Sequence, residues 1–406
     1  MELWRLSPGK TWYMAPYYKK GLIKPPVLRS GVEKEQERHA TWLELLYDLV
    51  FVAAISQLAT NLNKDYSFSG FLNFSILFVP VWWAWIGHTF YLTRFDSDDV
   101  IHRLLTMIQI VIVASLIVHL PEALGESSNG FALSYAAVRS ILVIEYWRAG
   151  RHNQHVRPLV NRYMIGFGSA AALWIVSTFI PVPHRFILWY LAMAIDFFAP
   201  ITAGQLHVKF PPHLMHLPER FGLFTIIVIG EAVVDIVMGI RAEHLDFVSG
   251  IEGIMGLIIV FTLWWGYFDG VKGAGTITLT SKDHVRAYQQ WLYSHLPLTM
   301  AIASVAVGIR RVMMLPTPEM LPSQEAWILS ASVGVCILSL NTIFLSSYPG
   351  RPPDEALRFV IPHYALAFVT CIVGGLGTIL SGIALLGVLT AFSILQILLS
   401  LRYLPE

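Results

Sequence analysis

The sequence predicts an all-α fold: a polytopic transmembrane helical bundle of about twelve spans, built as two parallel six-span repeats with both termini cytoplasmic. Composition, the lengths of the apolar runs and the placement of basic residues predict it. Of 406 residues, 55% are hydrophobic and 14% are charged, and the mean hydropathy is +0.58. Soluble domains carry about 25% charged residues. The composition therefore indicates residence in a membrane.

Net charge and cysteine content limit the kinds of partner and of cysteine role that we expect. The formal net charge is +1, which favours neither nucleic acid nor a strongly acidic protein. We expect the lipid bilayer and an unidentified small molecule or ion as partners, no nucleic acid, and leave a homo-oligomer open. Cys336 and Cys371 lie in apolar runs, where a thiol acts more often as a small hydrophobe than in a disulfide or a metal site. Residues 1–40 mix basic residues with prolines and aromatics, which predicts a cytoplasmic segment without a cleaved signal peptide.

Apolar runs give the expected spans, since a helix needs about 20 mostly apolar residues to cross about 30 Å of hydrocarbon. The division between the last two runs rests only on residues 374–377. The runs lie at 42–62, 70–92, 101–121, 130–148, 160–181, 184–204, 218–240, 248–272, 286–309, 325–346, 356–374 and 377–402.

The loops between these runs predict the orientation, because cytoplasmic loops carry the excess of Lys and Arg. Most basic residues fall in even-numbered loops or their flanks, on the side of the basic N-terminus; Arg310 and Arg311 are the main exception. The basic residues on that side are Arg94, Arg103, Arg148, Arg151, Arg157, Arg162, Lys209, Lys272, Lys282, Arg286, Arg351 and Arg358.

An internal repeat is suggested by two similar tryptophan motifs. VWWAWIGH at 81–88, followed by His102, recurs as LWWGYFDG at 263–270, followed by His284, with each feature 182 residues later. Upstream, residues 43–57 align with 218–232. The expected units are therefore the N-terminal segment, a first six-span repeat at 41–210 and a second at 211–406, with a central site between the repeats.

Ionisable residues inside the expected spans are the candidate functional groups, because a charge in the bilayer is costly. At 1.5 Å per residue, Arg139, Asp196, Glu231 and His295 all fall near the midplane, where they can meet. Two further acidic residues stand one helical turn from a carboxylate on the same helix face: Asp48 after Glu44 and Asp235 after Glu231.

Two interpretations of these charges stay open. Arg139 with Asp196 or Glu231 can be a buried ion pair that only fixes helix packing. One arginine cannot neutralise all the carboxylates, so the sharper hypothesis is a site for protons or a cation. For His295 and His363, a hydrogen-bonded histidine is favoured over a metal ligand.

Two smaller clusters allow a metal but favour other roles. Asp96, Asp98 and Asp99 lack the glycine and glutamate of an EF-hand loop, so salt bridges and capping of the third span are favoured. The spacing of His213, His216 and Glu219 lacks the His-Glu-x-x-His order of zinc hydrolases, and capping of the seventh span is favoured. We therefore name no metal and no cofactor. For the tryptophans at 82, 83, 85, 264 and 265, packing or pore lining competes with an interfacial belt.

Three stretches carry a resemblance to a known family: TWLELLYDLVFVAAISQLA (41–59), WWAWIGHTFYLTRFDSDD (82–99) and HLPERFGLFTIIVIGEAVV (216–234). Together with Trp264 to Asp269, they resemble the bacterial low temperature requirement A family over most of the chain. The resemblance implies a multi-span membrane protein and names no substrate. The motif positions that it carries over are Glu44, Asp48, Arg94, Asp96, Asp98, His216, Glu219, Arg220, Glu231 and Asp269.

A second resemblance concerns the first expected span alone. LELLYDLVFVAAI is similar to the pore-lining first helix of two-repeat, six-span potassium channels with a Phe-Ser-Asp signature. Here Tyr47 stands in place of the serine and Leu49 in place of the following glycine, so the chain departs from the potassium-channel signature at these two positions.

The functional hypothesis is a proton- or cation-coupled transporter, multi-pass in the inner (plasma) membrane. In this hypothesis, Glu231 with Asp196 or Asp48 takes up the ion. Arg139 either sets the pKa of the carboxylate that binds the ion or holds an anionic group of the substrate. The alternatives are a cation channel, a membrane-embedded metal-dependent enzyme using His216, Glu219 and the Asp96 cluster, and a lipid-interacting structural protein. Enzyme activity is disfavoured, since the chain carries no nucleotide loop, haem-attachment motif or serine nucleophile elbow.

Overall fold

The computed structural model describes residues 4–6, 12–14, 23–29, 41–96, 99–212, 216–242, 247–271, 282–316, 318–348, 350 and 352–402. Within these residues the fold has thirteen α-helices and four short strands. The first six helices are α1 (Trp42–Lys64), α2 (Phe68–Arg94), α3 (Val100–His119), α4 (Ser128–His152), α5 (Arg157–Ser177) and α6 (Arg185–Ile201). After the short α7 (Gln205–Lys209) come α8 (His216–Ala242), α9 (Phe247–Val271), α10 (Lys282–Met313), α11 (Ser323–Ser346), α12 (Pro353–Ile372) and α13 (Gly382–Ser400).

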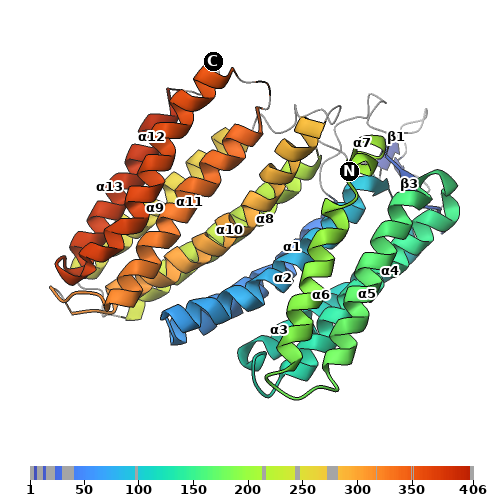
Figure 1. Ribbon diagram of the computed structural model, residues 1–406, viewed down its shortest axis with the longest axis horizontal. Helices are drawn as coiled ribbons and strands as arrows, with labels where there is room; N and C mark the ends of the chain where they lie inside the picture. Colours follow the sequence, from blue (N-terminus) through green and yellow to red (C-terminus); the bar gives the residue numbers. More distant parts are fainter. Residues whose placement is uncertain are drawn as a thin grey trace.

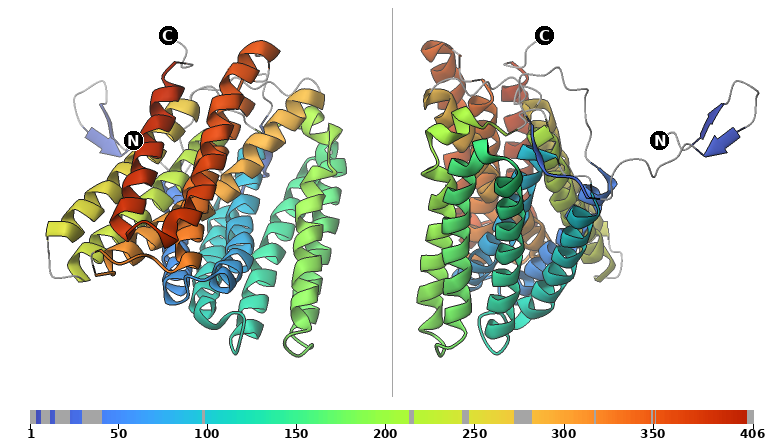
Figure 2. Two further views of the ribbon diagram at one scale, coloured as in Figure 1. Left: turned by 60° about the vertical axis from the view of Figure 1, so that its left-hand side comes forward. Right: turned by 90° about the vertical axis from the view of Figure 1, so that its right-hand side faces the viewer.

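The helices form two groups that meet along α1, α2, α8 and α10. Figure 1 shows α1 and α2 in the middle, with α3 to α6 on one side and α8 to α13 on the other. In both views of Figure 2, the long helices within each group run side by side. We call the first group (α1–α6) and the second group (α8–α13) the two halves, and their contact the junction.

Each of the twelve apolar runs coincides with one of the long helices, and a 3-10 turn, Val373–Thr378, separates the last two. Ten of the described helices are long and apolar enough to span a membrane. The two other long helices are α4, which carries Arg139, Glu145 and Arg148, and α6, which has only 17 residues. The chain is therefore a membrane protein with at least ten helices capable of crossing the bilayer.

Local capping fixes where several helices begin. The side chains of Thr41 and Ser67 accept hydrogen bonds from the Glu44 and Gly70 backbone N–H groups at the starts of α1 and α2. A Cβ added at Gly70 would lie 1.8 Å from the Asp65 carbonyl oxygen, so the tight α1–α2 connection requires glycine there.

The strands were not predicted. β1 (Trp4–Leu6) pairs with β2 (Trp12–Met14), and β3 (Val27–Leu28) pairs with β4 (Phe95–Asp96), both antiparallel. The second pair attaches part of the N-terminal segment to the end of α2. Two- and three-residue strands leave no periodic signal in a sequence.

The tryptophans of α2 pack inside the protein. Trp82, Trp83 and Trp85 are at most 2% exposed. Trp85 stacks on Phe224 of α8, with ring centroids 4.1 Å apart. Packing across the junction is therefore their role, whereas Trp264 of α9 is 38% exposed.

The two basic residues that break the expected loop pattern each have an acidic partner. Arg311 donates two hydrogen bonds to the carboxylate of Glu325, at 2.6 and 3.1 Å. Arg310 lies 3.5 Å from Asp235. Neutralisation by these carboxylates lowers the cost of placing both arginines at that end of α10.

Candidate functional site

The strongest polar cluster lies at the junction and joins four of the predicted motif residues. Arg220, in the second turn of α8, donates one hydrogen bond to Glu44 Oε2 at 2.8 Å and another to Asp48 Oδ1 at 2.7 Å. His216 Nε2 lies 3.3 Å from Glu44 Oε2. Glu44 and Asp48 are one turn apart on α1, so both carboxylates face the same guanidinium. We call Glu44, Asp48, His216 and Arg220 the junction cluster.

The junction cluster is removed from solvent, and its members are at most 5% exposed. Trp85 of α2 donates a third hydrogen bond, from Nε1 to Asp48 Oδ1 at 2.8 Å. The second oxygen, Asp48 Oδ2, is buried and has no hydrogen-bond donor among the described residues. Buried polar atoms are nearly always paired, so Asp48 Oδ2 is an acceptor that a proton or another positive group would satisfy.

Charge counting gives the same conclusion. The cluster contains two carboxylates and one guanidinium, so with neutral His216 and both acids ionised these four side chains carry a net charge of −1, while the positive charge of Arg29 also acts on Glu44. An uncompensated charge in a low-dielectric site is strongly disfavoured. Binding one proton or one monovalent cation restores neutrality.

A second buried cluster lies beside the first, within the first half. Glu145 Oε2 of α4 lies 3.4 Å from His88 Nδ1 of α2, and Glu145 Oε1 lies 3.6 Å from His102 Nδ1 of α3. Gln109 Nε2 of α3 donates to Glu145 Oε2 at 3.3 Å. We call His88, His102, Gln109 and Glu145 the His–Glu–His cluster. This cluster was not predicted, although Glu145 is a charged residue inside the apolar run 130–148 and was therefore a candidate functional group.

The two clusters are neighbours. Tyr47 is next to Asp48 on α1, and the centroid of its ring lies 4.3 Å from the ring centroid of His88. On α2, Trp85 and His88 are three residues apart and thus share a helix face. One face of α2 therefore contacts both clusters.

Of the four residues expected to meet, Arg139 and Asp196 contact each other. Arg139 Nε of α4 donates to Asp196 Oδ2 of α6 at 2.9 Å, and Tyr135 donates to the same oxygen at 3.0 Å. Both charged residues are fully buried. A Cβ at Gly87 would lie 2.4 Å from Arg139 Nη1, so glycine at this position leaves the space for the guanidinium. This is a one-to-one ion pair inside the first half.

Glu231 and His295 do not join this pair. Glu231 is half-buried on α8 and makes no hydrogen bond or ion pair with the described residues, while Asp235 faces Arg310. His295 is fully buried: its Nδ1 is 2.8 Å from the Trp291 carbonyl oxygen and its Nε2 is 3.1 Å from the Tyr267 hydroxyl. A neutral ring satisfies both contacts, since Nδ1–H donates and Nε2 accepts. The expected meeting of all four residues fails because helix rotation turns these side chains to other neighbours.

The acidic cluster after α2 caps a helix, as favoured. Asp99 accepts a hydrogen bond from the His102 backbone N–H at 3.0 Å and forms a buried ion pair with Arg148. Burial alone would raise the pKa of Asp99, but the hydrogen bonds from Arg148, His102 and Lys24 hold it below its usual value. Asp98 and the side chain of Asp96 lie outside the described residues.

Arg94 has a different environment from the other buried arginines. Its Nη2 donates to His207 Nδ1 at 2.8 Å, and His207 Nε2 lies 2.8 Å from the Pro200 carbonyl oxygen. Burial, and then the positive charge of Arg94, lower the pKa of His207 to about 4. His207 therefore acts as a neutral acceptor for a buried guanidinium.

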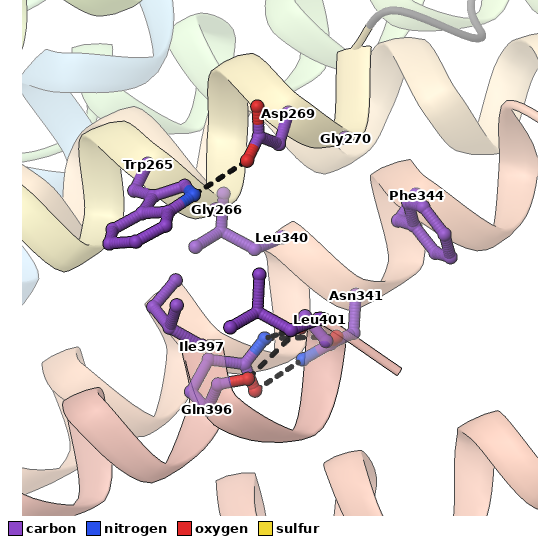
Figure 3. Close-up of a pocket in the computed structure, with 11 residues that line it drawn as sticks. Trp265, Gly266, Asp269, Gly270, Leu340, Asn341, Phe344, Gln396, Ile397 and Leu401 are labelled. Carbon is purple, nitrogen blue, oxygen red and sulfur yellow. Dashed lines mark hydrogen bonds between the residues drawn. The ribbon is translucent and has the colours of Figure 1, made fainter. Parts of the chain in front are cut away.

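Asp269 lines a small pocket in the second half (Figure 3). Trp265 donates to Asp269 at 2.6 Å, and the amides of Asn341 and Gln396 exchange hydrogen bonds at 3.0 and 3.1 Å. The cavity of about 20 Å³ has room for one water molecule.

No group of three or more His, Cys, Asp or Glu side chains within the described residues is arranged to hold a metal ion. His213 lies outside that part of the chain, and Glu219 is half-buried in the first turn of α8. Cys336 and Cys371 are free thiols in α11 and α12.

A larger cavity of about 370 Å³ lies at the other end of α1 and α2. Apolar side chains such as Leu58 and Phe74 line part of it, and polar groups line the remainder. The polar lining residues are Asn61, Lys64, Asp65, Asn73 and Glu122.

Comparison with known proteins places the chain in a family. The family described as bacterial low temperature requirement A protein (LtrA) matches residues 39–398, which include both polar clusters. An uncharacterized protein of Rhizobium meliloti (strain 1021) is 29% identical over 300 residues, covering 68% of this chain and 70% of the relative. With most of its length matched, the chain belongs to the bacterial low temperature requirement A family.

Proposed function

We propose that this protein is a proton- or cation-coupled transporter of an unidentified substrate in the bacterial inner membrane. One observation carries the proposal: at the junction of the halves, two buried carboxylates share one guanidinium, and Asp48 Oδ2 has no donor among the described residues. A site of that composition gains a proton or a cation at low electrostatic cost. The ion-binding role that the sequence suggested for Glu231 is better suited to Asp48.

The position of the junction cluster supports coupling to a conformational change. Arg220 belongs to α8 in the second half, whereas Glu44 and Asp48 belong to α1 in the first half. A shift between the halves changes the distance from Arg220 to the carboxylates and thus their affinity for a cation. Such a linked equilibrium is what an ion-coupled transporter requires.

The proposed topology has twelve spans in two six-helix repeats, 41–210 and 211–406, with cytoplasmic termini. Under this proposal α4 and α6 cross the membrane too, with Arg139 and Arg148 of α4 neutralised by Asp196 and Asp99. The repeat is supported by the paired tryptophans on the second helix of each half and by His102 and His284 in the first turn of each third helix.

Packing around α1 favours a transporter over an open cation channel. A channel needs a continuous hydrated path. Tyr47, Phe51, Ala54 and Leu58, which follow one face of α1, are at most 1% exposed. This face of α1 is filled with apolar contacts, which suits a closed state that opens by movement of the halves.

The cavity at the other end of α1 and α2 is the proposed access site for substrate. Its volume of about 370 Å³ lies within the range of about 300–1,000 Å³ for small-molecule sites. Lys64, Asp65 and Glu122 give it both signs of charge, which suits a small polar solute with both a cationic and an anionic group.

Proteoliposomes containing the purified protein test the proposal. We expect a pH gradient or a cation gradient to dissipate faster than in empty liposomes, and the excess rate to fall at least tenfold in Asp48→Asn. Glu231→Gln is the matched control, because Glu231 has no partner in the described part of the chain, and it should retain the flux. No flux above empty liposomes across protons and a panel of monovalent cations would refute the proposal.

A further inference from the structure

The His–Glu–His cluster contains a carboxylate between two imidazoles. The two oxygens of Glu145 face different histidines, His88 at 3.4 Å and His102 at 3.6 Å. All three residues are at most 6% exposed. They come from three helices, α2, α3 and α4, so the arrangement is set by tertiary packing.

Hydrogen bonding in this cluster is incomplete. Neither ring nitrogen of His88 has a hydrogen-bond partner among the described residues, and Gln109 Oε1 and Glu145 Oε1 also lack one. The close approach of His88 Nδ1 to a carboxylate oxygen becomes favourable when that nitrogen carries a proton. The contrast is His295, whose two ring nitrogens are both satisfied in the neutral form.

The net charge of the His–Glu–His cluster determines how many protons it binds most favourably. With ionised Glu145 and two neutral imidazoles its net charge is −1, and with one imidazolium it is zero. A second imidazolium would make the net charge +1. Because a buried charge needs compensation, the singly protonated form is the favoured one.

The groups around the His–Glu–His cluster do not change this charge balance. Tyr47 of α1 packs on His88, Tyr146 of α4 adjoins Glu145, and Arg220 of α8 acts on His88 at longer range. Arg220 is already bound to two carboxylates. At the start of α3, Asp99 and Arg148 neutralise each other beside His102.

We propose that the His–Glu–His cluster is a proton-binding site that exchanges one proton between His102 and His88 through the Glu145 carboxylate, next to Asp48. His102 Nδ1 gives its proton to Glu145 Oε1, the carboxylic acid group rotates, and the proton passes to His88 Nδ1, so that Glu145 is ionised again. In identifying the coupling ion as a proton, this inference rests on the proposed function; the existence of the proton site does not.

Nitrogen-15 NMR of histidine-labelled protein in lipid nanodiscs tests it directly. Spectra of His88→Gln and His102→Gln assign the two rings, and His295 is the internal reference for a neutral buried ring. We expect one imidazolium, shared by His88 and His102, in spectra recorded between about pH 6 and 8. It should be lost in Glu145→Gln, while the His295 signal is unchanged and shows that the variant is folded.

Two outcomes separate this inference from the proposed function. Neutral rings for both His88 and His102 over that pH range in the wild-type protein would overturn the proton site, even if flux through Asp48 is observed. An imidazolium that depends on Glu145, found in a protein without flux, would support the proton site and refute transport.

Discussion

Arg220 and Arg139 are both fully buried, yet they face different numbers of carboxylates. Arg139 pairs with Asp196 alone, inside the first half, with Tyr135 donating to the same oxygen. Arg220 contacts Glu44 and Asp48, which lie across the junction in the other half. The first arrangement pairs one carboxylate with one guanidinium, and the second pairs two carboxylates with one guanidinium.

The difference teaches how a structural ion pair is distinguished from a candidate ion site. Burial and short distances are common to both sites and do not separate them. Charge balance and location do, because a neutral pair within one half has no reason to bind another ion. A carboxylate that shares its guanidinium with a second carboxylate, across the junction of the halves, can gain from binding another cation.

The largest effect should come from removing the arginines and then their acids. Arg139→Gln and Arg220→Gln should each lower stability by about 3–5 kcal/mol, since each leaves buried carboxylates unpaired. Adding Asp196→Asn should restore most of the loss in Arg139→Gln. Adding Asp48→Asn to Arg220→Gln should restore only part, because Glu44 has still lost its guanidinium partner and keeps the contact with His216.

Thermal unfolding in detergent, monitored by tryptophan fluorescence, measures these four proteins against the wild type. Equal recovery in both double variants would contradict the difference in charge balance between the two sites.

Arg94 extends the comparison to an arginine with a neutral partner. His207, with a folded-state pKa of about 4 against 6.5 in a model peptide, binds protons more readily in the unfolded state. Its contribution is therefore fully present above pH 6.5 and is lost as the pH falls towards 4, by up to about 3 kcal/mol.

The melting temperature should therefore fall more steeply between pH 6.5 and 4 in the wild type than in His207→Gln. Parallel curves for the two proteins would show that His207 is not held neutral beside Arg94.

Gly87→Ala should disturb Arg139 without touching Arg220. The new Cβ would lie 2.4 Å from Arg139 Nη1, and overpacking of this kind costs about 1–3 kcal/mol. Gly168→Ala on α5 is the control, because a Cβ there meets no atom within 4 Å. Unfolding measurements should show a loss for the first substitution and none for the second; no loss in Gly87→Ala would show that Arg139 is free to move.

The smallest effect is expected at the partly exposed pair of Arg311 and Glu325. The Arg311 side chain is 33% exposed, so solvent screens the interaction. Glu325→Gln should lower stability by about 1 kcal/mol or less. A loss as large as that of Arg139→Gln would mean that exposure does not separate surface pairs from buried ones in this protein.

Much of the fold was predictable from sequence because it depends on run length. Each apolar run of about 20 residues became a helix. The number of transmembrane helices was less predictable. The charges on α4 complete the clusters of the first half, and these charges lower the hydropathy of α4. The short strands depend on contacts between distant segments and gave no signal.

The candidate site was predictable as a set of residue types, and less so as a set of partners. Charged residues in apolar runs correctly indicated Arg139, Asp196 and Asp48 as buried groups. Depth along a helix does not fix rotation about its axis, so Glu231 was placed at the centre although it lies half-buried. Arg220 was identified only through the family resemblance. Its two contacts depend on how α8 packs against α1.

The most direct test of the central claim compares two isosteric substitutions, Asp48→Asn and Asp196→Asn. Proton flux into proteoliposomes is measured per folded protein, with the melting temperature of each variant. We expect Asp48→Asn to stay folded, because Glu44 still pairs with Arg220, and to lose flux at least tenfold. Asp196→Asn should lower the melting temperature and leave the flux of the folded fraction within about twofold of wild type. Equal loss of flux in both variants, or flux that survives in Asp48→Asn, would contradict the account.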